Sequence, residues 1–177
     1  MRLRFIGLLL TFFSLTCGAQ TNIFFLIQPK SLVSISSVDF SGKFTSVKGQ
    51  VTISKDSLLV QGFDLIIDVN TLDLEIPGMT KHAKSADFFD VTNFPSITFF
   101  GDSVQSLGGK GTVFGTMKAK GVERPMAIPF TVTLDNKLIT VETLFTINLS
   151  DFSIGLKEEV SDEVLIKATL LGKKSKD

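Results

Sequence analysis

Apolar and polar residues alternate with a period of two along most of the chain. Between Val47 and Ser54 the odd positions are apolar or glycine and the even positions are polar. This is the pattern of a strand with one buried and one solvated face. After a turn at 55–57, a second apolar face runs from Leu59 through Phe63 to Val69. We therefore predict two adjacent strands in this region.

The clearest hairpin lies in the second half of the chain. Even positions are mostly apolar from Val122 to Leu134, and after a turn at 135–136 the odd positions from Ile139 to Leu149 are mostly apolar. Only 78–89 has room for one or two helical turns. Eight or nine strands joined by turns indicate an all-β antiparallel barrel or sandwich. Its shorter strands are expected at 23–27, 32–40, 96–104, 112–119 and 164–171.

Two prolines refine the prediction for the strand that begins at Val122. Pro125 and Pro129 share one parity, so the N–H groups that both residues lack would face the same neighbouring strand. A central strand rarely loses two ladder bonds on one side. We predict that this side of the strand is an edge, a bulge or the seam of a barrel.

The N-terminus has the features of a secretion signal at residues 1–19. Arg2 and Arg4 precede the uncharged apolar run 5–15, and small residues lead up to Ala19. We expect cleavage after Ala19, export to a bacterial periplasm or the medium, and a single domain at 20–177. The apolar run is too short to span a bilayer. Cys17 fits a lipoprotein signal poorly, so lipidation is the less favoured alternative.

Charge and aromatic content narrow the class of ligand. Without Arg2 and Arg4 the chain has 16 basic and 18 acidic residues, a net charge of −2. This balance provides no electrostatic basis for binding nucleic acid or an anionic membrane surface. The aromatic residues are 17 Phe, with neither Trp nor Tyr. Because Phe has no polar atom, it suits a dry core or an apolar cavity.

The segment from His82 to Phe99 contains the single histidine together with two aspartates and four phenylalanines. Two interpretations stay open. The segment is either a lid that closes a barrel with its phenylalanines toward a cavity, or a well-packed connection. Lys81, His82 and Lys84 form a cationic group beside it. This group either holds an anionic head group or is a solvated turn.

Catalytic and metal sites have little support. A single histidine excludes a multi-histidine metal site, and cleavage as predicted would remove the one cysteine. Ser85, His82 and Asp87 are the residue types of a catalytic triad, but one irregular segment rarely has triad geometry. Asp87 and Asp90 could form an acid–base pair. We favour the alternative that Ser85 or Asp87 caps a short helix or turn and that Asp90 ends it. The glycines of 108–111 are expected in a turn, because no phosphate-binding Lys-Ser or Lys-Thr follows them.

Residues 85–99, S-A-D-F-F-D-V-T-N-F-P-S-I-T-F, resemble the YceI-like, polyisoprenoid-binding family. That family shows S-x-D-F-F-D-V followed by an aromatic residue, Pro and I-T-F. The resemblance extends to Lys120-Gly121-Val122 with Pro125, and to 148–154 and 161–164, so it covers nearly the whole mature chain. The chain departs from the family at Leu149 and Ser153, where the family has Arg and Gly.

The resemblance implies an extended, lipocalin-like, eight-stranded antiparallel barrel with a short helical lid. Its apolar tunnel would hold an isoprenoid or other fatty chain, without catalysis and without a metal or other cofactor. A filled barrel that binds a partner protein is one alternative, and an enzyme that uses His82 and Asp87 on a bound lipid is another. The oligomeric state stays open, a homodimer included. The expected ligand contacts are His82, Lys84, Asp87, Phe88, Phe89, Phe94, Phe99, Phe130 and Phe145.

Overall fold

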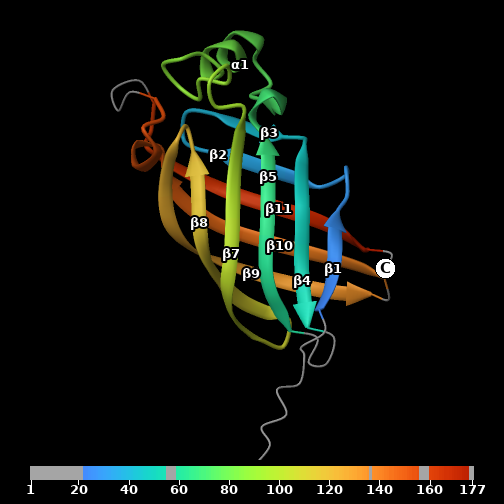
Figure 1. Cartoon of the computed structure of the whole chain (residues 1–177). Coiled ribbons are helices and arrows are strands. Elements are labelled where there is room, and N and C mark those ends of the chain that lie inside the picture. Colours follow the sequence, from blue (N-terminus) through green and yellow to red (C-terminus); the bar gives the residue numbers. More distant parts are fainter. Residues whose placement is uncertain (1–21, 55–58, 136, 156–159, 176–177) are drawn as a thin grey trace, which may run out of the picture.

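Eight antiparallel strands close into a barrel in the computed structural model, which describes residues 22–54, 59–135, 137–155 and 160–175 (Figure 1). The ring order is β1-β4-β5-β7-β8-β9-β10-β11, and β11 pairs with β1 to close it. The predicted eight-stranded antiparallel barrel is confirmed. The predicted signal peptide at 1–19, including Cys17, lies outside the described residues. The ring strands are β1 (Asn22–Ile27), β4 (Val47–Ser54), β5 (Val60–Asp68), β7 (Ser96–Leu107), β8 (Lys110–Ala119), β9 (Val122–Asp135), β10 (Leu138–Asn148) and β11 (Glu163–Lys174).

Three short strands lengthen the barrel at one end. They are β2 (Leu32–Ser36), β3 (Ser41–Phe44) and β6 (Leu72–Asp73). β2 continues β1 along the edge of β11, since Ile27 pairs with Gly172 and Leu32 pairs with Thr169. β3 pairs with β2 and β6 in the same way that β4 pairs with β1 and β5. The eleven strand segments therefore form one extended barrel.

The lid, defined here as residues 77–95, covers this lengthened end (Figure 1). It consists of helix α1 (Pro77–Ala83) and the loop that leads to β7. Two short 3-10 helices, η1 (Val69–Thr71) and η2 (Leu149–Phe152), lie on connections at the same end. Across the described ranges, no helix is long and apolar enough to cross a membrane.

Helix α1 begins where proline is best tolerated and ends after two turns. Pro77 occupies the first turn, where its missing N–H has no intrahelical acceptor to lose. The N-cap is Ile76, which has no side-chain cap bond, and the helix ends at Ala83. Ser85 and Asp87 were expected to cap a short helix or turn; neither caps α1, because both follow it, but a backbone turn runs from Ser85 to Asp90, whose N–H donates to the Ser85 carbonyl oxygen at 2.8 Å. Asp90 instead has a left-handed backbone (φ 48°), and its carboxylate accepts hydrogen bonds from Asn93 Nδ2.

The predicted apolar face of β5 is confirmed except at its start. Phe63 is buried and Leu65 and Ile67 are half-buried, but Val60 is buried while Leu59 is 42% exposed. The reason is an irregularity in the β4–β5 pairing between Thr52 and Ile53, which shifts the register by one residue. A one-residue shift moves the alternation onto the other face.

The prolines interrupt the pairing between β9 and β10, as predicted. β9 pairs with β8 without a break from Val122 to Thr131, but its pairing with β10 stops at Thr131, which faces Glu142. We call the unpaired boundary between 122–130 of β9 and 143–148 of β10 the seam. Of the three predicted alternatives, an edge, a bulge or a seam, the structure has the seam. Gly108 and Gly109 have left-handed φ angles in the β7–β8 turn, as expected of turn glycines, but the same expectation is wrong for Gly111, which lies in β8.

Candidate ligand-binding cavity

A cavity of about 190 Å³ lies inside the barrel, under the lid. Its walls are inward-facing side chains of β2 to β11, and α1 and η2 contribute to it at the lid end. Among the described lining residues, only His82 and Thr143 carry a polar side-chain atom. The Thr143 hydroxyl donates to the Pro129 carbonyl oxygen at 2.6 Å, so it is already occupied. The cavity therefore offers a hydrocarbon surface, which suits an apolar chain.

The cavity ends near the middle of the barrel. Phe63 and Phe130 both line it, and their rings meet edge to face with centroids 5.2 Å apart. On β10, Val141 lines the cavity but Ile139, the next inward residue toward the far end, does not. The two phenylalanines thus form the floor of the cavity. The side chains that fill the barrel beside and beyond this floor are buried and outside the lining; they include Phe25, Val51, Ile53, Val60 and Ile139.

The lid supplies the roof. Ala83 of α1 and the loop residue Phe88 are buried against the cavity, and His82 lines it while its side chain stays exposed. The His82 and Phe88 rings lie edge to face with centroids 4.7 Å apart. The Phe89 ring meets Phe44 of β3 at 6.0 Å. These contacts support the lid interpretation of the segment over that of a connection packed away from any cavity.

Two glycines outside the lid receive its aromatic rings. A Cβ atom at Gly155 would lie 2.8 Å from Phe88 Cε1, and one at Gly121 would lie 2.9 Å from Phe94 Cε1. Both glycines have positive φ, +71° and +78°. At each position the missing side chain lets a phenylalanine lie directly on the backbone. The lid is therefore fastened to the turns after β8 and after η2.

Two half-buried lysines add polar attachments to the lid. Lys84 Nζ donates to the Asn70 carbonyl oxygen at 2.7 Å, and Lys120 Nζ donates to the Asp87 carbonyl oxygen at 3.3 Å. Both bonds are exposed, so each contributes little to stability. Apolar packing of the phenylalanines is the larger attachment.

The structure divides the nine expected contact residues into two groups. His82, Phe88, Phe89, Phe99, Phe130 and Phe145 line the cavity. Lys84, Asp87 and Phe94 are outside the lining. Lys84 borders a shallow groove on the outside of α1, together with Asp73 and Glu75. Whether the residues of either group touch a ligand stays a prediction.

Aliphatic residues make up much of the lining that sequence reasoning missed. Val33 and Ile35 of β2, Ile147 of β10 and Val164 of β11 all line the cavity, and so does Phe152 of η2. The available signal was the shared parity of Val33 with Ile35 and of Val164 with Ile166 in the predicted strands at 32–40 and 164–171. The expected contacts were instead drawn from the lid and from phenylalanines alone.

The residue types of a triad do not assemble in the lid. Ser85 Oγ is buried and has no hydrogen-bond partner, so it is not bonded to His82. The Asp87 side chain is exposed and outside the cavity lining. An activated serine needs contact with its base, and that contact is missing here. Within the described ranges, no three His, Cys, Asp or Glu side chains gather into a group that could hold a metal ion.

Comparison with known proteins adds an independent line of argument. Residues 18–171 match the YceI-like domain. The chain belongs to the YceI-like domain family. Protein YceI of Salmonella arizonae is 30% identical over 98 residues, which is 55% of this chain and 48% of that protein. This YceI-like chain thus spans about half the length of the curated relatives it matches.

Solved structures share the fold of this YceI-like chain. BcnA of Burkholderia cenocepacia has a TM-score of 0.73 at 27% identity, over 80% of this chain and 96% of BcnA. A YceI protein of Campylobacter jejuni has a TM-score of 0.70 at 18% identity, over 80% and 88%. A polyisoprenoid binding domain of Saccharophagus degradans has a TM-score of 0.68 at 16% identity, over 86% and 98%. The last two identities are low enough that they show the fold alone.

Proposed function

We propose that this YceI-like protein binds and carries an isoprenoid or another lipidic chain in the cavity under the lid. The observation that carries the proposal is the apolar lining, in which the one hydroxyl is already bonded to a backbone carbonyl. A domain of the same fold from Saccharophagus degradans is described as polyisoprenoid binding. Burying an apolar chain would contribute about 25 cal/mol per Å² before the costs of association.

The proposal includes export and a role without catalysis. The signal-like pattern at 1–19 favours a place of action outside the cytoplasm. His82 is the one titratable residue among the described lining residues, so the cavity wall offers a bound chain no acid–base pair.

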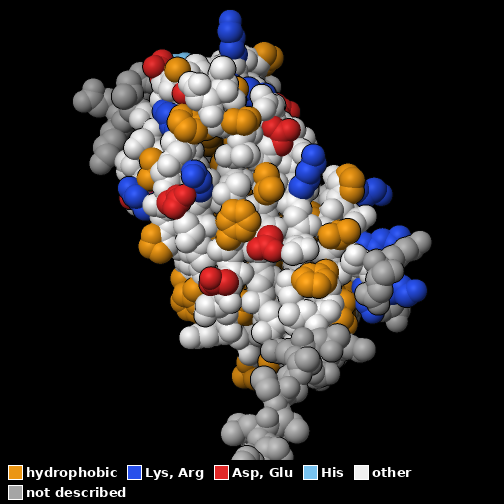
Figure 2. All heavy atoms as spheres, in the orientation of Figure 1, with side chains coloured by type: hydrophobic (Ala, Val, Ile, Leu, Met, Phe, Trp, Pro, Cys, Tyr) orange, Lys and Arg blue, Asp and Glu red, His pale blue; other side chains and the backbone are white. Residues whose placement is uncertain are grey.

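A barrel with a filled core that binds a partner protein has less support. The cavity leaves space where such a barrel would be packed. On the face shown in Figure 2, hydrophobic side chains lie in separate groups between charged and neutral ones. Protein-binding surfaces usually have a larger continuous apolar patch.

Native mass spectrometry after mild purification, followed by lipid extraction, tests the proposal. Ala168 of β11 lines the cavity, so Ala168→Phe should fill it and abolish co-purified lipid. The matched control is Thr169→Phe, whose side chain points outward from the same strand, and it should retain the lipid. A wild-type protein that never carries lipid and fails to bind added farnesol would contradict the proposal.

A further inference from the structure

The wall of the cavity is open at the seam. On β10 the inward residues Ile139 and Val141 are 1% and 2% exposed, next to the paired part of β9. Beyond the last pair, at Glu142, the inward residues Thr143, Phe145 and Ile147 all become half-buried while still lining the cavity. Solvent therefore reaches the cavity lining where the ladder is missing.

Pro129 fixes which groups of β9 face this opening. Its carbonyl oxygen accepts a hydrogen bond from Thr143 of β10. In an antiparallel strand the N–H and C=O of one residue point to the same neighbour, and those of the next residue to the other. Because β9 pairs with β8 without a register shift, the carbonyls of Pro125 and Glu123 also point into the seam.

Arg124 occupies an inward-facing position of β9, but its side chain extends through the seam to solvent. Its cross-strand partner is Met117, which is buried and lines the cavity, and directly opposed residues share a face. The Arg124 side chain is nevertheless exposed. Its Nη1 donates to the Glu123 carbonyl oxygen at 3.0 Å, which points into the seam. The guanidinium therefore lies in the seam, beside the cavity lining at Met117, although Arg124 is not itself a lining residue.

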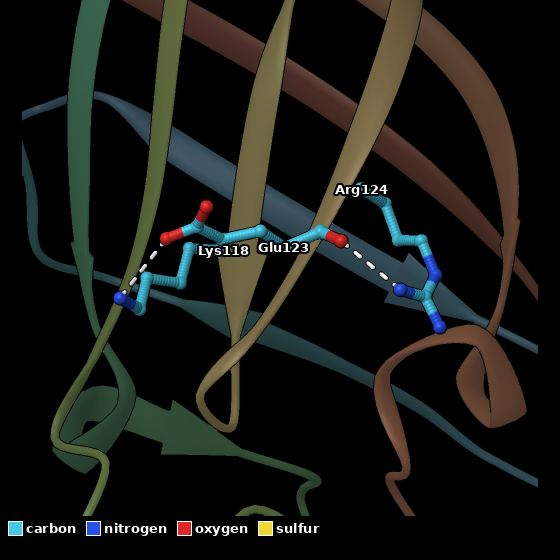
Figure 3. A network of polar contacts seen from close by, with 3 residues as sticks. All are labelled: Lys118, Glu123 and Arg124. Atoms are coloured by element: carbon cyan, nitrogen blue, oxygen red, sulfur yellow. Dashed lines mark hydrogen bonds and ion pairs between the residues drawn. The ribbon is translucent and has the colours of Figure 1, made fainter.

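The Arg124 guanidinium stands apart from the neighbouring ion pair. The Glu123 carboxylate pairs with Lys118 at 3.1 Å, and Figure 3 shows Arg124 pointing away from that ion pair. In the part of the chain that the structure describes, no acidic side chain pairs with Arg124. An unpaired guanidinium beside an apolar opening has the chemistry to recognise a phosphate or a carboxylate.

We propose that the ligand is an anionic amphiphile whose chain lies in the cavity and whose head group binds Arg124 in the seam. The inference rests on the proposed function and adds the charge of the ligand and the place where its head group emerges. Lys84 and Lys120 donate to backbone carbonyls at the rim of the lid, and Lys118 is paired on the outer face. Among these four described cations, Arg124 alone has its Cβ on the inner face of the barrel and its charged group in solvent.

Displacement of the neutral fluorophore N-phenyl-1-naphthylamine by farnesol and by farnesyl phosphate tests the inference. The two competitors share one chain, so their ratio isolates the head group. In the wild-type protein, farnesyl phosphate should compete at least about tenfold better. In Arg124→Gln this advantage should fall about tenfold, or about 1.4 kcal/mol, while farnesol competes as before. Arg124→Lys should keep part of the advantage.

Lys118→Gln is the matched control, because it removes a neighbouring cation on the outer face and should leave the ratio unchanged. Circular dichroism confirms that each variant is folded. Equal competition by farnesol and farnesyl phosphate in the wild type, or an unchanged ratio in Arg124→Gln, would overturn the inference while farnesol binding still supports the proposed function. Failure of both the fluorophore and farnesol to bind would overturn the proposed function together with the inference.

Discussion

The two ends of the barrel are built from the same strands but have different interiors. At the end away from the lid, Val51, Ile53 and Ile139 are at most 2% exposed and fill the space between the strands. At the lid end the same alternation on β10 lines a cavity. Close packing stabilises the first end, whereas the second leaves apolar surface unpaired for a ligand.

The hydrogen bonds between β9 and β10 also differ between the two ends. Its ladder runs from the Asp135–Leu138 pair to the Thr131–Glu142 pair, and then stops. Pro129 would be the next residue to bond β10, and it has no N–H. At the end away from the lid, the side chains fill the barrel and β9 pairs with β10. At the lid end, a cavity remains between the side chains and this pairing is missing. We infer that most of the stability of this barrel comes from the half without the cavity.

The largest expected effect is on stability, and it compares two isoleucines of β10. Ile139→Ala should destabilise the lipid-free protein by about 2–5 kcal/mol, because it empties a site in the packed end. Ile147→Ala should cost about 1 kcal/mol, since that side chain already borders a cavity and solvent. Urea unfolding of both variants measures the difference. Equal losses would show that the two ends are equally packed.

A smaller effect is expected from two glycines with positive φ at opposite ends. Gly108→Ala in the β7–β8 turn meets no atom within 4 Å, so it should cost only the strain of a left-handed backbone, about 1 kcal/mol. Gly155→Ala has the same strain and also meets Phe88 at 2.8 Å. It should cost about 1–2 kcal/mol more. Urea unfolding gives both values, and cleavage by a protease within the lid should accelerate in Gly155→Ala alone. Matching behaviour of the two variants would mean that Phe88 does not hold the lid.

Local alternation predicted the hairpins and an antiparallel barrel or sandwich, and the resemblance to the YceI-like family favoured the barrel. The seam followed from Pro125 and Pro129, because the parity of two prolines is a property of the strand itself. The prediction that Leu59 lies on the inner face was wrong. Its cause, the register shift between Thr52 and Ile53, arises from how β4 and β5 pair and cannot be seen in the sequence of either strand alone. Cavity volume could not be predicted either, since it depends on how side chains from distant strands meet.

The placement of charged side chains was predicted less well than that of apolar ones. Lys84 was expected at the ligand, but the helix preceding it directs its amine to Asn70 outside the cavity. Arg124 is a charged residue on the apolar parity of β9, which the sequence shows. Its meaning depends on the missing pairing with β10, which only the assembled barrel shows.

The smallest expected effect is the gain in ligand affinity for each added methylene. The chain length at which this gain stops locates the boundary between the cavity and the filled end. The affinity of 1-alkanols should rise about fourfold with each methylene, since burying one contributes about 0.8 kcal/mol. The rise should stop when the chain reaches the Phe63–Phe130 floor. Fluorophore displacement across the series measures this length. Phe130→Ala should move the plateau to longer chains, and Ala168→Phe should move it to shorter ones. A plateau that neither variant moves would place the ligand outside the cavity, and the contrast between a hollow and a filled end would then have no bearing on binding.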